Sequence, residues 1–279
     1  MYDFRAAGIG RDPDGRPDLR KPSLVLTAGE AFRIPGEYAG SLLLGLLADP
    51  LVADRGLGGG RPVLVVPGFH ATDAATARLR GHLAHRGWDP YGWGVGTNHG
   101  LTDQVLDGVL ARLDEVHGDH QEPVSLVGWS FGGLLVRWLA QQRPELVRQV
   151  VTLGSPWRPE GERTRTTRMF ERSRRTHGLS ARAEEVLDEL REPLLVFSTS
   201  IYSRTDGIVP WRGCAQDPGD GPAASENIAV PSSHVGLVAN PLALAAVTDR
   251  LAQDPSAPVP FSWRRVLRSS VTAPLRRAS

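Results

Sequence analysis

The stretch Gly128-Trp129-Ser130-Phe131-Gly132 decides the fold of this chain. An apolar run at 123–127 precedes it, and apolar side chains follow at helical spacing, at Leu134, Leu135, Trp138 and Leu139. A strand that turns sharply into a helix presents a serine hydroxyl at the edge of a sheet, and glycines on both sides leave room for neighbouring backbone. The stretch therefore predicts a nucleophile elbow with Ser130 as the nucleophile.

Two more residues, which come later in the chain, complete the group of catalytic side chains that a serine at a nucleophile elbow requires. A serine hydroxyl requires a general base, and the base requires an acid that orients it. In an elbow architecture the acid comes first and the histidine second, each on a loop after a strand. Asp206 follows the apolar run 193–199, and His234 follows the short run 227–230. We expect Ser130, Asp206 and His234 to meet as nucleophile, acid and base.

Backbone N–H groups are the expected donors to the oxygen of a reacting carbonyl group, where negative charge develops. The N–H of Phe131 directly follows the nucleophile and lies at a predicted helix N-terminus. The first core strand, 62–66, runs into Pro67-Gly68-Phe69-His70, where glycine allows a close backbone approach. The N–H of Phe69 is therefore the second expected oxyanion donor.

Four further side chains are candidates for the substrate pocket: His70, Asn98, Trp129 and Trp157. For Asn98 the alternative is a turn followed by a helix cap, because it lies in the polar stretch 96–100.

These segments resemble the α/β-hydrolase superfamily, and within it bacterial lipases and esterases. The resemblance covers roughly residues 61–251 and is carried by the motifs at 66–69, 128–133, 154–157, 204–207 and 233–237. Pro67 stands where lipases more often have histidine, a side chain that helps to hold this loop in relatives. The resemblance implies a serine hydrolase that cleaves carboxylic esters of small molecules or lipids through an acyl-enzyme, without a cofactor.

Two other functions stay open. The superfamily contains acyltransferases and thioesterases that use the same three residues, and it also contains proteins that bind a ligand without turnover. A fluorophosphonate probe separates the last class, because it labels only an activated serine.

The pattern of the remaining chain predicts the same fold class. Apolar runs at 62–66, 123–127, 149–153, 193–199 and 227–230 alternate with helical patterns at about 73–86, 101–117, 131–142 and 240–252. This alternation indicates an α/β fold, with a mostly parallel sheet and helices on both faces. The segment 88–97 is expected to add a strand. Asp73 is expected to cap the first helix, at about 73–86.

The expected organisation is a loose tail over 1–35, a hydrolase domain over 36–252 and a basic tail over 253–279. Within the domain, 41–53 reads as an amphipathic helix, and 157–191 as a short arginine-rich cap over Ser130. The cap predicts either a basic gate for anionic substrates or a solvated surface. The basic tail is either solvated or in contact with an anionic membrane surface.

Composition limits the class of protein further. The chain has 279 residues, 41% hydrophobic, with a net charge of +1, which predicts one soluble globular domain and argues against a nucleic-acid partner. The single cysteine, Cys214, excludes an intrachain disulfide and is compatible with a cytoplasmic location. No Cys/His spacing indicates a metal site.

Overall fold

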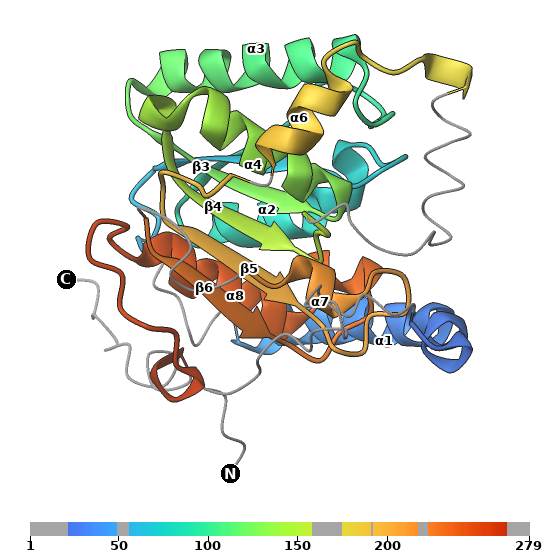
Figure 1. The fold of residues 1–279 in the computed structure, drawn as a ribbon. Helices are drawn as coiled ribbons and strands as arrows, with labels where there is room; N and C mark the ends of the chain where they lie inside the picture. Colours follow the sequence, from blue (N-terminus) through green and yellow to red (C-terminus); the bar gives the residue numbers. More distant parts are fainter. Residues whose placement is uncertain (1–21, 49–55, 158–174, 191, 217–222, 267–279) are drawn as a thin grey trace, which may run out of the picture.

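A computed structural model describes residues 22–48, 56–157, 175–190, 192–216 and 223–266 (Figure 1). Six parallel strands form the sheet of this part of the chain, in the order β2-β1-β3-β4-β5-β6. Their bounds are β1 Pro62–Val66, β2 Asp89–Gly92, β3 Val124–Trp129, β4 Val147–Leu153, β5 Ser198–Tyr202 and β6 Ser225–Ala229. The order reverses between β1 and β3, and sites in such sheets lie beyond the carboxyl ends of the strands at this point.

Helices cover both faces of the sheet (Figure 1). One face packs against α3 (Asp103–His120), α4 (Phe131–Gln142) and α6 (Ala183–Glu189), and the other against α2 (Ala77–His85) and α8 (Pro241–Ala252). Leu64 and Val66 of β1 belong to the first cluster, whereas Val63 and Val65 belong to the second. Both faces of β1 are buried, which explains why this strand is a continuous apolar run. The predicted α/β-hydrolase fold class is confirmed.

Four short helices connect these elements: η1 (Asp73–Thr76), η2 (Pro144–Leu146), α7 (Trp211–Cys214) and η3 (Val235–Val238). The strand expected at 193–199 is displaced, because β5 begins at Ser198. Leu194 packs into the helical cluster on the α4 face, so the apolar residues before β5 are buried without pairing in the sheet. Asp73 is not a helix cap either, since its carboxylate accepts from the backbone N–H groups of Trp93 and Gly94 after β2.

The N-terminal tail expected over 1–35 is wrong from Leu24 onward, where α1 (Leu24–Ala48) begins. This helix includes the amphipathic segment expected at 41–53 as far as Ala48 and contacts η3 and α8. Its charged residues turn toward the body, whereas Val25, Phe32 and Leu43 are exposed. The sequence pattern was misleading because this helix directs charged residues, among them the buried Glu30, toward the protein.

The basic tail expected over 253–279 is wrong for residues 253–266, which lie on the hydrolase body. Phe261 and Trp263 pack against the cluster on the α8 face, with their ring centroids 4.8 Å apart. The N–H of Phe261 donates to Glu226 of β6, and the buried Arg250 donates to the carbonyl oxygen of Val259. Aromatic burial and these hydrogen bonds fix the segment, and residues 267–279 lie outside the described part of the chain.

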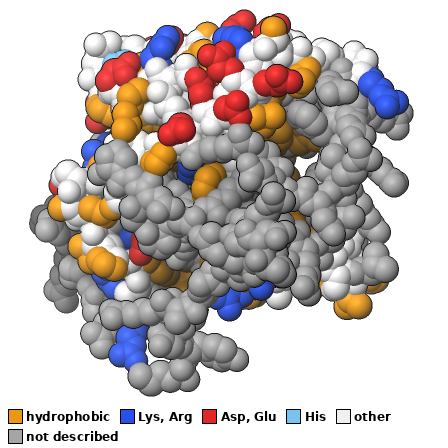
Figure 2. All heavy atoms as spheres, viewed as in Figure 1, with side chains coloured by type: hydrophobic (Ala, Val, Ile, Leu, Met, Phe, Trp, Pro, Cys, Tyr) orange, Lys and Arg blue, Asp and Glu red, His pale blue; other side chains and the backbone are white. Residues whose placement is uncertain are grey.

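The arginine-rich cap expected over 157–191 lies partly outside the described residues, because 158–174 and 191 are not among them. The described part is acidic at α6, and Figure 2 shows acidic side chains gathered where Figure 1 places α3 and α6. Arg182 binds Asp107 of α3 at 2.6 Å. Its charge is therefore paired with α3, and whether the cap acts as a basic gate or as a solvated surface stays a prediction. Among the described residues, no helix is long and apolar enough to cross a membrane.

Candidate active site

Ser130 lies at the turn between β3 and α4 with φ 53° and ψ −124°. Few residues other than glycine adopt a positive φ, and such strain persists only where the surrounding structure enforces it. Its N–H donates to the carbonyl oxygen of Leu153 at the end of β4, at 2.8 Å. The backbone therefore holds the serine at the carboxyl end of the sheet, as the elbow motif predicts.

Glycines around Ser130 are required by close backbone contacts. A Cβ on Gly128 would lie 2.5 Å from the carbonyl oxygen of Gly132 and from the Cα of Gly133. A Cβ on Gly132 would overlap the carbonyl oxygen of Val66, and one on Gly133 would overlap the Ser155 side chain. Because backbone cannot move aside as a flexible side chain does, Gly128 and Gly132 accept a Cβ only with a shift of α4 or β1, whereas a Cβ on Gly133 would have to displace the buried Ser155 side chain.

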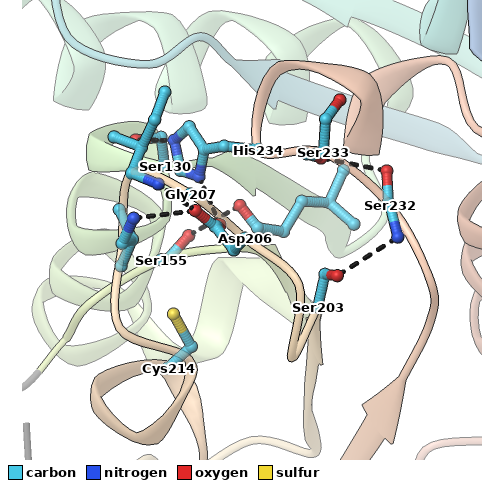
Figure 3. A network of polar contacts seen from close by, with 12 residues as sticks. Ser130, Ser155, Ser203, Asp206, Gly207, Cys214, Ser232, Ser233 and His234 are labelled. Atoms are coloured by element: carbon cyan, nitrogen blue, oxygen red, sulfur yellow. Dashed lines mark hydrogen bonds and ion pairs between the residues drawn. The ribbon is translucent and has the colours of Figure 1, made fainter. Parts of the chain in front are cut away.

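The structure brings Ser130, Asp206 and His234 together, although they come from three separate loops (Figure 3). His234 Nε2 lies 2.9 Å from Ser130 Oγ, and His234 Nδ1 lies 2.6 Å from Asp206 Oδ2. With Nδ1–H donating to the carboxylate, Nε2 carries the lone pair that accepts the serine hydroxyl. The three side chains thus form a continuous chain of hydrogen bonds.

Asp206 is only 3% exposed, and its second oxygen is also used. Asp206 Oδ1 accepts from the backbone N–H of Ile208 at 2.8 Å and of Val209 at 2.7 Å. A buried carboxylate with these donors keeps its orientation, because rotation would leave buried N–H groups without partners. Its Oδ2 is therefore held toward the imidazole.

The pKa of His234 is raised above its usual value of 6.5. Burial alone lowers this pKa, but the charge of Asp206 and its hydrogen bond outweigh that effect, and Glu30 adds a further upward contribution. The site therefore stabilises the protonated imidazole, which is the form that a general base reaches when it takes the serine proton.

The loop after β1 lies directly over the serine. A Cβ on Gly68 would stand 3.1 Å from Ser130 Cβ, so glycine gives this loop its close approach. The rings of Phe69 and Phe131 are 5.7 Å apart, which places the two residues expected as oxyanion donors beside each other. The role of their N–H groups stays a prediction.

Asn98 is not a pocket residue, because it is fully buried. Its side-chain Nδ2 donates to the backbone carbonyl oxygen of Pro67 at 2.9 Å, and its backbone carbonyl oxygen accepts from the N–H of His70 at 2.8 Å. His70 adopts φ 57°, so the loop is bent sharply at the point that Asn98 braces. Asn98 thus holds the loop in a chain that has proline where lipases more often have the supporting histidine.

The two tryptophans expected in the pocket are also largely buried, each 8% exposed. Trp129 Nε1 donates to the backbone carbonyl oxygen of His234 at 3.1 Å and so supports the histidine loop. Trp157 stacks on the buried guanidinium of Arg137, 4.5 Å from the ring centroid. These large rings are used mainly in packing and in support, and a role for either of them in the pocket stays a prediction.

His70 is exposed, and its ring lies 4.3 Å from that of Phe69. On its other side lies His99, which stacks on His177 with a centroid distance of 3.7 Å. His177 belongs to a short helical turn at 175–177, so the described end of the cap region meets the loop at 96–100. Of the four expected pocket residues, His70 alone has an exposed side chain beside the serine loop.

Sequence reasoning missed the contribution of α1. Glu30, Arg33 and Glu37 all contact the loops that carry Asp206 and His234. The available signal was their spacing, because they are the charged residues of an otherwise uncharged helix and lie on one side of it.

Among the described residues, no group of three His, Cys, Asp or Glu side chains is arranged to hold a metal ion.

Comparison with known proteins agrees with this architecture. A family model described as the α/β-hydrolase fold matches residues 66–174. Lipase B of Aspergillus fumigatus superposes with a TM-score of 0.58 at 19% identity, over 78% of this chain and 59% of that one. This chain thus spans less than two thirds of the length of lipase B.

Two shorter lipolytic enzymes are also similar. A monoacylglycerol lipase of Paleococcus ferrophilus gives a TM-score of 0.49 at 16% identity, over 69% of this chain and 96% of that one. A metagenome-derived lipolytic enzyme gives 0.48 at 18% identity, over 69% and 93%. No curated protein sequence matches the chain. The family model, the likeness to lipase B and the sheet order agree, and the chain therefore has the α/β-hydrolase fold.

Proposed function

We propose that this protein is a serine hydrolase that cleaves carboxylic esters through an acyl-enzyme on Ser130. The observation that carries the proposal is the continuous hydrogen-bond chain from Ser130 Oγ through the His234 imidazole to the buried Asp206 carboxylate. Nucleophile, base and acid at these distances, on a strained turn at the carboxyl end of a parallel sheet, form the constellation that activates a serine for acyl transfer.

The proposed reaction has two halves. Ser130 Oγ attacks the ester carbonyl carbon while His234 Nε2 takes the hydroxyl proton. The tetrahedral intermediate then breaks its bond to the alcohol, and His234 returns the proton to the leaving oxygen. In the second half, water attacks the acyl carbon, passes a proton to His234, and the acid leaves as Ser130 Oγ is protonated again. Asp206 stays ionised throughout and stabilises the imidazolium.

Backbone N–H groups of Phe69 and Phe131 are the donors that we propose for the oxyanion. Their residues lie side by side over the serine, and Phe131 begins α4, where the helix dipole favours an anion. Each such donor contributes about 2.7 to 4 kcal/mol to lowering the barrier. The rings of the same two residues supply an apolar surface beside the acyl carbon, which favours esters with an uncharged acyl group.

A series of p-nitrophenyl esters from acetate to palmitate tests the proposal and ranks the acyl chains. We expect turnover of at least one ester by the wild-type protein and none above background by Ser130→Ala. Added alcohol or hydroxylamine distinguishes hydrolysis from acyl transfer by the share of product that it captures. Equal rates for both proteins would contradict the assignment of Ser130, and binding of esters without turnover would favour a ligand-binding protein.

A further inference from the structure

We propose that Glu30 of α1 is a positioning residue that joins the acid loop to the histidine loop; this inference rests on the proposed function. Glu30 Oε1 accepts from the backbone N–H of Gly207, next to Asp206, at 2.7 Å. Glu30 Oε2 accepts from the backbone N–H of His234 at 2.9 Å. One carboxylate from a distant helix therefore binds both loops at the residues that matter for proton transfer.

Because the Glu30 carboxylate is buried, its contacts favour one arrangement of the loops that carry Asp206 and His234. Glu30 is 6% exposed, and a buried carboxylate is costly unless donors surround it. The donors are the two loop N–H groups and the guanidinium of Arg33, at 3.1 Å. Arg33 in turn donates to the carbonyl oxygen of Thr205 at 2.6 Å. If the loops move apart, the carboxylate loses its donors, so its burial favours the arrangement in which Asp206 meets His234.

Both loops have glycine where α1 approaches them. A Cβ on Gly207 would overlap the backbone of Leu26, and one on Gly236 would overlap the Glu37 carboxylate. Neither glycine has a positive φ, so the close packing of α1 and not backbone conformation requires them. Thr27 Oγ1 also donates to the carbonyl oxygen of Gly207 at 2.7 Å. The two glycines thus leave room for α1, and side chains of α1 form hydrogen bonds to the same loops.

The charge of Glu30 acts on the same histidine. Asp206 faces His234 from the loop after β5, and Glu30 faces it from α1 together with Arg33 and Glu37, which contact the neighbouring residues 232 and 233. Glu30 raises the pKa of His234 in the same direction as Asp206, after burial has lowered it. Loss of the Glu30 charge should therefore lower this pKa, an effect that packing alone would not produce.

The test compares Glu30→Ala and Glu30→Gln with the matched control Glu226→Gln. Glu226 also accepts from a backbone N–H, that of Phe261, and pairs with Arg250, but it lies at the amino-terminal start of the edge strand β6, whereas Ser130 follows the carboxyl end of the central strand β3. We expect Glu30→Ala to lower kcat by about 10- to 100-fold with little change in KM, as small misplacements of reacting groups do. Glu30→Gln keeps one acceptor for Gly207 and should recover part of kcat. Glu226→Gln should lower Tm and leave kcat and the pH profile unchanged.

The pKa of His234, measured by NMR titration, gives a readout that does not depend on turnover. We expect Glu30→Gln to lower it relative to the wild type, and Glu226→Gln to leave it in place. An unchanged pKa in Glu30→Gln, or a Glu30→Ala protein with lowered Tm but wild-type kcat, would overturn the proposal. If Glu30→Ala does not fold, Gly207→Ala displaces α1 without removing a carboxylate, and wild-type kcat in that variant would overturn it.

Labelling of the wild-type protein distinguishes a failure of the proposed hydrolase function from a failure of the role proposed for Glu30. A fluorophosphonate probe that does not label wild-type Ser130 contradicts the proposed hydrolase, whatever the Glu30 variants show. If the probe labels the wild type and Glu30→Ala at the same rate, the proposed role of Glu30 is contradicted and the proposed hydrolase is not.

Discussion

The nucleophile and its two partners are held by different means. Ser130 lies on a turn whose shape is set by its own neighbours in sequence, namely β3, α4 and the glycines at 128, 132 and 133, with one backbone hydrogen bond to Leu153 of β4. Asp206 and His234 lie on loops that α1 contacts from far away in the chain, through Glu30 and its neighbours. The first half of the site is thus a local structure, and the second half is a tertiary one.

This difference has a consequence for stability and activity. The turn at Ser130 is packed between β1 and β4 in the centre of the sheet, so damage there should disturb the core. The acid and histidine loops lie toward the edge at β5 and β6, where α1 covers them. Damage there should separate Asp206 from His234 while the sheet stays folded.

The largest effect is expected for Ser130→Ala. Removal of the hydroxyl should lower kcat by about 10⁶-fold, because binding and the oxyanion donors supply only a small remainder of catalysis. The fold should persist, since the hydroxyl contributes little packing. Steady-state kinetics with a reactive ester, beside circular dichroism, measures both, and substantial turnover by a folded variant would remove Ser130 from the mechanism.

Asp206→Asn should have the next largest effect, about 10⁴-fold on kcat with a modest change in KM. The amide keeps the size of the side chain but no longer stabilises the imidazolium or selects the reactive tautomer. Kinetics across the same esters measures the split between kcat and KM. A rate close to that of the wild type would mean that another carboxylate orients His234.

Gly132→Ala and Gly207→Ala compare the two halves directly. Gly132→Ala forces a methyl group against β1 and should lower the free energy of unfolding by about 1 to 3 kcal/mol, together with activity. Gly207→Ala presses on α1, which can shift, so we expect a smaller loss of stability and a clear loss of kcat. Urea unfolding monitored by tryptophan fluorescence, combined with kinetics, separates these outcomes. Equal losses of stability in both variants would contradict the proposed difference between the turn at Ser130 and the loops that carry Asp206 and His234.

The smallest effect is a shift along the pH axis. Because the pKa of His234 is raised above 6.5, kcat/KM should rise with pH along a midpoint higher than that of an ordinary histidine. The raised pKa stabilises the fold fully below the unfolded value of 6.5, and this stabilisation disappears as pH rises through the folded value. Activity therefore increases over the range in which this contribution to stability falls. A profile with its midpoint at or below 6.5 would contradict the electrostatic account.

Sequence alone predicted the local half of the site and the order of the residues in the other half. The elbow was readable because β3, the glycines and α4 follow one another within residues 123–142. The loops after β5 and β6 were readable as loops, but not what holds them, because Glu30 lies on a helix whose charged side faces inward. Asn98 was misplaced for a related reason, and Trp129 and Trp157 are more deeply buried than the sequence indicated. Polar and aromatic residues near a site support it as often as they line it, and burial separates the two roles only once tertiary packing is known.

The most direct test of the central claim is a pre-steady-state experiment with p-nitrophenyl acetate. An acyl-enzyme on Ser130 predicts a burst of p-nitrophenol that approaches one equivalent per protein where deacylation is slow. Peptide mapping after an acid quench should then place the acetyl group on Ser130, and Ser130→Ala should give neither burst nor adduct. Turnover without any adduct on Ser130, or an adduct on another residue that survives in Ser130→Ala, would contradict the account.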